Sequence, residues 1–352
     1  MPRIEDIERF AFVVGAPRCG TTSLANFLKP HPDVCFPVLK EPHYFAQHDL
    51  KALNDADLRS EIEREYLARF FPHSASVARI AADCSVSYLY APEQLEPALR
   101  IWPKSRFIVS LRDPIEMIPS LHQRLVSLGD ESLTSFEEAW AAVPDRAQGR
   151  RIPPSCVEPR WLRYDEAGRY ATYLERLFAT VGSERCIVLL FDDLAADPAG
   201  QYRKLMDFLD LPPVEETVNF EPRRESYGVR FHWLQRLLKR PPKPLWKYLS
   251  GPFQQKRERK LDGKDPDSPV FDTIFAIRKR LLRWNRVPLS KRPPPLWVQE
   301  EIRAQLKGEI ERVGKLIGRD LDHWLQLRPQ AGANKYMSSP KIAAQPSFTA
   351  AE

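Results

Sequence analysis

The most constraining feature of the sequence is the run FAFVVGAPRCGTTS at residues 10–23. Its apolar start is typical of a buried strand, Gly15 and Gly20 bracket a tight loop, and Thr21 opens a helical pattern. The glycine spacing is that of a nucleotide-binding P-loop, but Thr21 stands where the P-loop lysine follows the second glycine. The loop carries its fixed cation at Arg18 instead.

A loop that leads into a helix N-terminus presents unpaired backbone N–H groups and the positive end of the helix dipole. The consecutive hydroxyls of Thr21, Thr22 and Ser23 add further donors. The sequence therefore predicts an anion cradle, and a guanidinium inside it suits a terminal group with less charge than a triphosphate. The alternative is a glycine turn between a strand and a helix, without a ligand.

Composition limits the class of protein. With 352 residues, 43% apolar and 28% charged, the chain is long enough for one large α/β domain or two smaller ones. The start MPRIEDIERF has no apolar signal core, and the five cysteines show no close pairing. Both observations favour a cytoplasmic protein with reduced thiols. No His/Cys cluster suggests zinc, so we expect no metal requirement.

Positive charge is concentrated in residues 221–264, which hold 13 Lys and Arg against four Asp and Glu. The same stretch carries aromatic side chains at Trp233, Trp246, Tyr248 and Phe253. Basic and aromatic residues together indicate an anionic membrane surface, an anionic substrate or nucleic acid, and the alternative is a solvated, proline-interrupted insertion. No nucleic-acid motif accompanies the stretch, so we expect no nucleic-acid partner.

Strands and helices alternate along the chain. Short apolar runs predict strands over residues 11–15, 34–36, 79–82, 107–111 and 186–191. Helical patterns lie between them, over residues 22–28, 58–70, 92–101, 114–128, 168–181 and 200–209. This order predicts a parallel sheet covered on both faces, with ligands beyond the carboxyl ends of the strands.

A second strand end carries a candidate anion-binding pair. The predicted strand over residues 107–111 runs into Arg112, and Asp113 is a good N-cap for the next helix. Ser120 lies about two turns into that helix. Arg112 and Ser120 are therefore candidates to clamp a second phosphate. The alternative is a surface ion pair of Arg112 with Asp113 or Glu116.

A third strand end leads into LKEPHYF, residues 39–45. Pro42 disfavours the helical region for Glu41, so this segment is predicted to be extended or turning. In an extended segment Glu41 and His43 point to the same side, as a general base and its partner would. Lys40 adds a cation. The alternative is a surface turn of mixed charge.

These three segments together resemble the sulfotransferases that use 3′-phosphoadenylyl sulfate (PAPS), in the bacterial branch similar to heparan-sulfate and other carbohydrate sulfotransferases. The resemblance covers residues 8–327. Further matching segments are ADCSVSYLYAPE at 82–93, GRYATYLERLF at 168–178, VLLFDDLAADP at 188–198 and KLIGRDLDHWL at 315–325.

The resemblance implies a role for each candidate. The loop that grips the 5′-phosphosulfate would comprise Arg18, Cys19, Gly20, Thr21, Thr22 and Ser23. Arg18 would also stabilise the bridging oxygen as the sulfuryl group leaves, and Arg112 and Ser120 would clamp the 3′-phosphate. Glu41 would be the catalytic base, with His43 beside it as the alternative base. The weaker charge of a sulfuryl group is consistent with a missing P-loop lysine and no Mg²⁺.

Two features depart from the family pattern or match it less closely. Heparan-sulfate-type relatives often carry Glu-Lys where this chain has Asp83 and Cys84, so that lysine's contribution is missing or comes from Lys40. The adenine-side loop is matched to RRESYGVR, with Tyr227 or Arg224 as the candidate contact.

The fold predicted from these observations is a P-loop-like, three-layer α/β domain with a central parallel sheet flanked by helices. It is expected to occupy residues 1–328 as a single domain. Within it, residues 221–297 are predicted to be an irregular, basic, acceptor-side region and residues 297–327 a C-terminal helix. Residues 329–352, rich in Ala, Ser, Pro and Gln, are predicted to be a disordered tail.

The expected activity is transfer of a sulfuryl group from PAPS to a hydroxyl of a carbohydrate or glycolipid. We expect a cytoplasmic protein, with peripheral contact to the inner face of the membrane through residues 221–264. One alternative is a P-loop kinase or NTPase. The other is a non-catalytic, basic membrane-surface protein that keeps a degenerate nucleotide fold.

Overall fold

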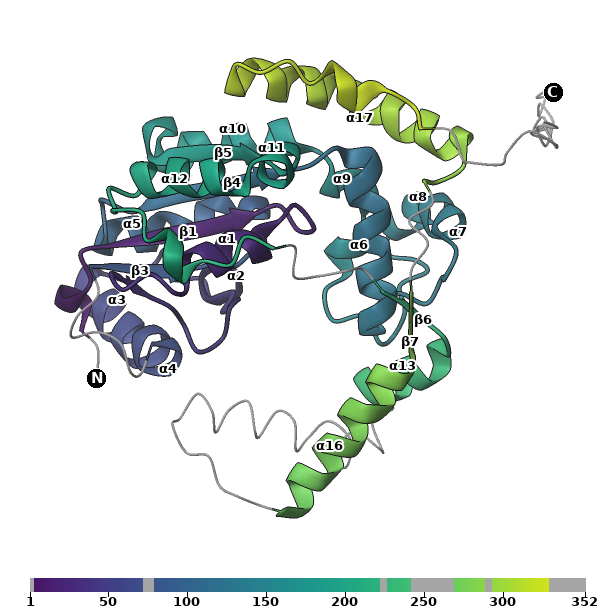
Figure 1. The fold of residues 1–352 in the computed structure, drawn as a ribbon, viewed down its shortest axis with the longest axis horizontal. Helices are drawn as coiled ribbons and strands as arrows, with labels where there is room; N and C mark the ends of the chain where they lie inside the picture. Colours follow the sequence, from purple (N-terminus) through teal and green to yellow (C-terminus); the bar gives the residue numbers. More distant parts are fainter. Residues whose placement is uncertain (1–2, 72–78, 222–226, 242–268, 289–292, 329–352) are drawn as a thin grey trace, which may run out of the picture.

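A parallel sheet of five strands, in the order β2-β3-β1-β4-β5, organises the protein (Figure 1). The computed structural model describes residues 3–71, 79–221, 227–241, 269–288 and 293–328. The strands are β1 Arg9–Gly15, β2 Val34–Cys35, β3 Ile80–Asp83, β4 Arg106–Leu111 and β5 Cys186–Leu190. All pairings between them are parallel, which confirms the predicted sheet and, to within two residues at each end, its five strands.

The central strand β1 is buried at every residue and packs on both faces. Phe10 and Phe12 belong to the core on one side of the sheet, whereas Ala11 and Val13 belong to the core on the other side. Phe12 stacks on Phe107 of β4 with ring centroids 5.4 Å apart. Because successive side chains of a strand point to opposite faces, this one strand joins both layers of helices.

Helices cover the two faces unequally, which gives the predicted three layers. The smaller layer is α1 Thr21–Leu28, α11 Phe191–Ala196 and α12 Pro198–Phe208. The larger layer includes α2 Tyr44–Gln47, α3 Asp55–Glu61, a π-helical segment Ile62–Leu67, α4 Ala68–Phe70, α5 Glu96–Ile101 and α10 Tyr170–Val181. Beside the sheet lie α6 Pro114–Leu128, α7 Phe136–Ala141, α8 Val143–Ala147 and α9 Tyr164–Ala167.

The C-terminal helix is shorter than predicted. Helix α17 spans Leu296–Ile317 and packs on α10 and α6, whereas the sequence predicted a helix over residues 297–327. Gly318 adopts the left-handed conformation, with φ of 64°, and its N–H bonds back to Gly314. This is a common way for a helix to end, so the remaining residues turn back and form a short 3₁₀ helix at Asp322–Leu325.

The basic region at residues 221–297 is more regular than predicted. It contains β6 Tyr227–Val229, α13 His232–Lys239, α16 Pro269–Trp284 and β7 Arg286–Pro288, with β6 and β7 antiparallel. The Asn285 side chain ties these elements together, since it accepts from the Phe231 N–H at 2.8 Å and donates to the Phe231 carbonyl at 3.0 Å. Partners 54 positions apart are not visible in local sequence patterns. The predicted tail at 329–352 lies outside the described residues.

Candidate active site

The loop between β1 and α1 is built as the sequence predicted. Gly20 is the N-cap of α1 with φ of 86°, and Arg18 also has a positive φ of 64°. A Cβ atom on Gly20 would lie 2.8 Å from Leu194 Cδ2, so packing as well as backbone conformation requires glycine. The Ala16 N–H donates to the Ser110 carbonyl at 2.7 Å, and the Ser110 hydroxyl donates to the Cys19 carbonyl. Strand β4 therefore holds the loop in place.

Arg18 and Ser120, predicted to act on different phosphates, are joined directly. The Arg18 Nε donates to Ser120 Oγ at 3.0 Å across 102 positions of sequence. Thr21 is buried, and Thr22 and Ser23 are half-buried at the start of α1. The cradle and helix α6 thus form one continuous surface.

Arg112 lies at the end of β4, and its guanidinium is bonded to an acid. Its Nε and Nη2 atoms donate to Glu116 Oε2 at 2.9 and 2.6 Å. The guanidinium also lies over the Phe191 ring of α11, 4.6 Å from the centroid. The ion pair with Glu116 that we considered as the alternative is therefore present. The Arg112 backbone also forms a hydrogen bond with the Cys19 thiol, so the Arg112–Glu116 ion pair lies beside the cradle. Burial raises the pKa of this thiol to about 12.

A second guanidinium, not found from the sequence, reaches the same corner. Arg328 Nη2 donates to Asp113 Oδ2 at 2.9 Å, and its Nη1 pairs with Glu116. The buried side chain of Gln299 holds the Arg328 backbone by two hydrogen bonds of 2.8 Å each. Arg112 and Arg328 therefore converge on one carboxylate. No local signal predicts a contact between Arg328 and Asp113, because they are 215 positions apart.

Glu41, His43 and Lys40 come together at the neighbouring edge. Lys40 Nζ lies 2.6 Å from Glu41 Oε1, and His43 Nε2 lies 3.5 Å from Glu41 Oε2. Burial alone would raise the pKa of Glu41, but the hydrogen bond with His43 and the charge of Lys40 lower it to about 2. The predicted pairing is confirmed, although not by an extended segment: His43 has a positive φ of 56° and is the N-cap of α2.

Behind His43 lies a hydrogen-bond network around Asp83, a residue that in the sequence stood out only as part of a departure from the family pattern. Ser87 Oγ lies 2.7 Å from His43 Nδ1, and the His43 N–H donates to Ser85 Oγ at 2.8 Å. Ser85 Oγ in turn donates to the buried Asp83 carboxylate at 2.6 Å. That carboxylate also accepts from the hydroxyls of Tyr66 and Tyr88. Asp83 therefore anchors the turn that positions His43.

Tyr227, the candidate adenine contact, lies on a strand beside the helix that carries Ser120. It belongs to β6, which packs on α6, and the Arg286 guanidinium lies over its ring, 4.1 Å from the centroid. Among the described residues no hydrogen bond or ion pair joins Tyr227 to Arg18, Arg112 or Ser120. The other candidate, Arg224, lies outside the described residues.

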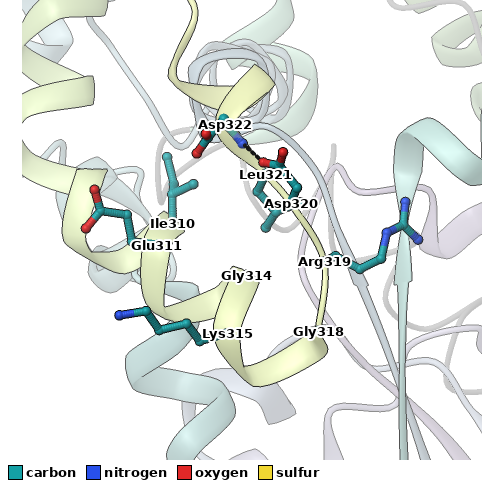
Figure 2. A pocket seen from close by; sticks show the side chains of 9 residues that line it. All are labelled: Ile310, Glu311, Gly314, Lys315, Gly318, Arg319, Asp320, Leu321 and Asp322. Carbon is teal, nitrogen blue, oxygen red and sulfur yellow. Dashed lines mark hydrogen bonds between the residues drawn. The ribbon is translucent and has the colours of Figure 1, made fainter.

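A hollow of about 410 Å³ lies at the end of α17, between its last turns and the turn at residues 318–322 (Figure 2). It contains none of the candidates from the sequence. The Arg319 side chain at its rim donates to Asp193 Oδ2 of α11 at 2.8 Å. Trp324 Nε1 donates to Asp192 Oδ2, also on α11, at 3.1 Å. These bonds tie the C-terminal segment to the helix whose first residue, Phe191, lies under Arg112.

Among the described residues no group of three or more His, Cys, Asp or Glu side chains is arranged to hold a metal ion. The cations that the described residues bring to this site include the side chains of Arg18, Lys40, Arg112 and Arg328.

Comparison with known proteins identifies the family. The sequence model described as the Sulfotransferase family matches residues 11–216, which include the cradle, the Glu41–His43 pair and four complete strands. The chain belongs to the Sulfotransferase family. This membership agrees with the resemblance carried by its motifs.

Individual relatives are distant. The chain is 25% identical over 307 residues to the mouse "Bifunctional heparan sulfate N-deacetylase/N-sulfotransferase 4", covering 82% of this chain and 31% of the relative. It is 25% identical over 251 residues to human "Carbohydrate sulfotransferase 15", covering 58% of this chain and 44% of the relative. The chain thus spans less than half the length of these relatives. The crystal structure of a sulfotransferase from Alicyclobacillus acidocaldarius shares the fold, with a TM-score of 0.56 and 22% identity. The match covers 90% of this chain and 98% of the other chain.

We predict that Gly20→Ala lowers the free energy of unfolding by about 1–3 kcal/mol, because the new Cβ meets Leu194 and the backbone is left-handed. Urea unfolding measures the change. Gly308→Ala in α17 is the control, since no atom lies within 4 Å of its Cβ position. That change should stabilise the protein by about 0.5–1 kcal/mol. Equal effects of the two substitutions would contradict the prediction.

A second prediction concerns pH. Burial raises the pKa of Asp113 from its ordinary 3.8 to about 6. The folded protein therefore binds this proton more tightly than the unfolded chain does, and its free energy of unfolding falls as the pH rises from about 4 to about 6. In the wild type this decrease in the free energy of unfolding is on the order of 3 kcal/mol, and Asp113→Asn should remove it. Urea unfolding at several pH values measures the decrease. The control Asp207→Asn, at an exposed position of α12, should retain the decrease seen in the wild type. Parallel profiles for the wild type and Asp113→Asn would rule this out.

Proposed function

We propose that this sulfotransferase transfers the sulfuryl group of PAPS to a hydroxyl of a carbohydrate or glycolipid acceptor, without a metal ion. The observation that carries the proposal is the cradle whose cation, Arg18, is bonded to Ser120 at 3.0 Å, beside Arg112 on the next strand end. Backbone N–H groups at the start of α1 and these two guanidinia suit a ligand with an anionic group at each end.

The chain's own groups fit each step of an in-line displacement. Glu41 accepts the proton of the acceptor hydroxyl, whose oxygen forms the new bond to sulfur. The bond between sulfur and the bridging oxygen breaks, and its electron pair remains on the 5′-phosphate. Arg18 and the N–H groups of α1 offset the charge that develops there. Positioned donors and cations of this kind supply most of the catalysis expected for such a transfer.

Glu41 supports this role by geometry and by charge. Its carboxylate is ionised over the whole range from weak acid to neutral pH, because the hydrogen bond with His43 and the charge of Lys40 outweigh burial and lower its pKa to about 2. In this proposal the Lys40 ammonium, 2.6 Å from Glu41 Oε1, also offsets charge on the transferring group. His43 is held by Ser85 and Ser87, so in this proposal it is a positioning residue for Glu41.

The acceptor class rests on the relatives. Both the "carbohydrate sulfotransferase" and the "heparan sulfate N-deacetylase/N-sulfotransferase" relatives are named for sugar substrates. We extend that class to this chain as part of the proposal, together with a cytoplasmic setting. We also treat residues 1–328 as one catalytic domain, since Arg328 completes the corner occupied by Arg112.

The donor proposal predicts that the protein binds adenosine 3′,5′-bisphosphate in the absence of Mg²⁺. Arg18→Ala and Arg112→Ala should each abolish this binding, since the first removes the cation of the cradle and the second removes the cation beside it. Isothermal titration calorimetry measures it. Arg64→Ala, which removes an exposed ion pair with Glu61, should leave it unchanged. Tight binding of Mg²⁺–ATP with no binding of the bisphosphate would instead support a kinase or NTPase.

The base assignment predicts that Glu41→Gln lowers kcat by about 10²–10⁴-fold while adenosine 3′,5′-bisphosphate still binds. Transfer of labelled sulfate to a carbohydrate and lipid extract measures the rate. Because the pKa of Glu41 is about 2, the wild-type rate should not fall between about pH 7 and pH 5. Glu93→Gln, which disrupts an ion pair with Arg176 on the surface, is the matched control. A steep loss of activity on acidification to pH 5 would contradict the assignment.

A further inference from the structure

Helices α13 and α16 expose an apolar surface that the donor site does not use. On α16, Ile277, Leu281 and Trp284 follow one another at intervals of four and three residues, which places them on one face of the helix. All three side chains are exposed. Figure 1 shows α16 extending away from the sheet, with α13 beside it.

The apolar surface continues onto the segment that starts α13. The exposed Phe231 ring stacks on Trp284 with centroids 5.7 Å apart, and Trp233 is 67% exposed two residues later. We call Phe231, Trp233, Ile277, Leu281 and Trp284 the α13–α16 face. It holds five of the nine large hydrophobic side chains that are exposed among the described residues. A cluster of this kind marks an interaction surface, whereas single exposed apolar residues do not.

The same elements carry a dense positive charge. Basic side chains stand at Arg230, Arg236, Lys239, Lys279, Arg280, Arg283 and Arg286. Among the described residues no Asp or Glu forms an ion pair with any of these seven, whereas Arg240 is paired with Asp130 at 2.9 Å. The Arg230 guanidinium lies over the Trp284 ring, 5.2 Å from its centroid, so cations border the apolar face directly.

This combination matches the surface of an anionic bilayer. A helix that lies on a membrane buries aliphatic and Trp side chains in the headgroup region and directs Lys and Arg toward anionic lipids. Soluble acidic polysaccharides or nucleic acid would pair with the cations, and bases would stack on the aromatic rings, but neither offers an aliphatic phase to cover Ile277 and Leu281. The aliphatic stripe therefore favours a lipid surface.

We propose that the α13–α16 face docks this sulfotransferase onto an anionic lipid membrane, with α16 lying along the surface. The face includes Phe231 and Trp233 from the stretch 221–264 that composition first suggested, and it extends beyond that stretch to α16. The proposal is independent of the donor and the acceptor, because neither Arg18 nor Glu41 takes part in it.

The apolar part is tested by co-sedimentation of the full chain with vesicles of phosphatidylcholine and phosphatidylglycerol at 7:3. The wild type should bind them and should not bind pure phosphatidylcholine. Leu281→Ser with Trp284→Ser should weaken binding about tenfold or more, because both side chains lose their burial in the bilayer. The control is Leu316→Ser with Trp297→Ser on α17. These residues are 38% and 47% exposed, against 38% and 52% for the tested pair.

The electrostatic part is tested in the same assay. Arg230→Glu with Arg280→Glu should weaken binding about 25-fold or more, since both side chains border the apolar face and each basic residue near an anionic surface contributes about fivefold. Lys307→Glu with Lys315→Glu on α17 makes the same change in net charge and should have less than a twofold effect. Thermal unfolding of every variant verifies that it is folded, and all the substituted side chains are more than one-third exposed.

Three outcomes would overturn the proposal. One is equal loss of binding in the tested and control charge-reversal pairs, which would mean that only the net charge of the protein matters. Another is full binding by the Leu281→Ser and Trp284→Ser variant together with displacement of the wild type by heparin, which would mark a soluble polyanion site. The last is no binding of the wild type to the anionic vesicles at all.

Discussion

The candidate site depends on how the short connection between β1 and α1 is held. Its backbone takes positive φ at Arg18 and Gly20, and the neighbouring strand supports it through two bonds of Ser110, one to the Ala16 N–H and one to the Cys19 carbonyl. Because β1 is buried on both faces, the start of α1 cannot shift without disturbing the core. The fold itself therefore holds the shape of the cradle, and a preformed site reduces the ordering cost of binding.

The carboxyl edge of the sheet gathers cations from three parts of the chain. Arg18 comes from the loop after β1, Arg112 from the end of β4, and Arg328 from the segment that follows α17. Arg112 and Arg328 share the Glu116 carboxylate, which keeps two like charges close together at a tolerable electrostatic cost. An anionic ligand that displaced this carboxylate would meet both guanidinia at once. Helix α17 thus belongs to the site, although it is far from it in sequence.

The sequence predicted the frame of the fold well and the supports of the site less well. All five strands were recognised because each is a short apolar run that ends at a helix signal. The pairing of Glu41 with His43 was also predicted, but the turn that creates it depends on the buried Asp83 and its serine and tyrosine donors. Asp83 was interpreted only as part of the Asp83-Cys84 departure from the family's Glu-Lys, since a carboxylate that anchors a turn cannot be distinguished from a substitution in the linear sequence.

The sequence by itself determined the alternation of strands and helices, the anion cradle with its cation at Arg18, and the family, because these depend on residues close together in the chain. Only the tertiary structure decided that Arg18 bonds Ser120, that Arg328 reaches Asp113, and that the basic region forms α13, α16 and a small sheet. These contacts join residues 54 to 215 positions apart. Local propensities do not specify such pairings, which form only when burial of the shared core brings the segments together.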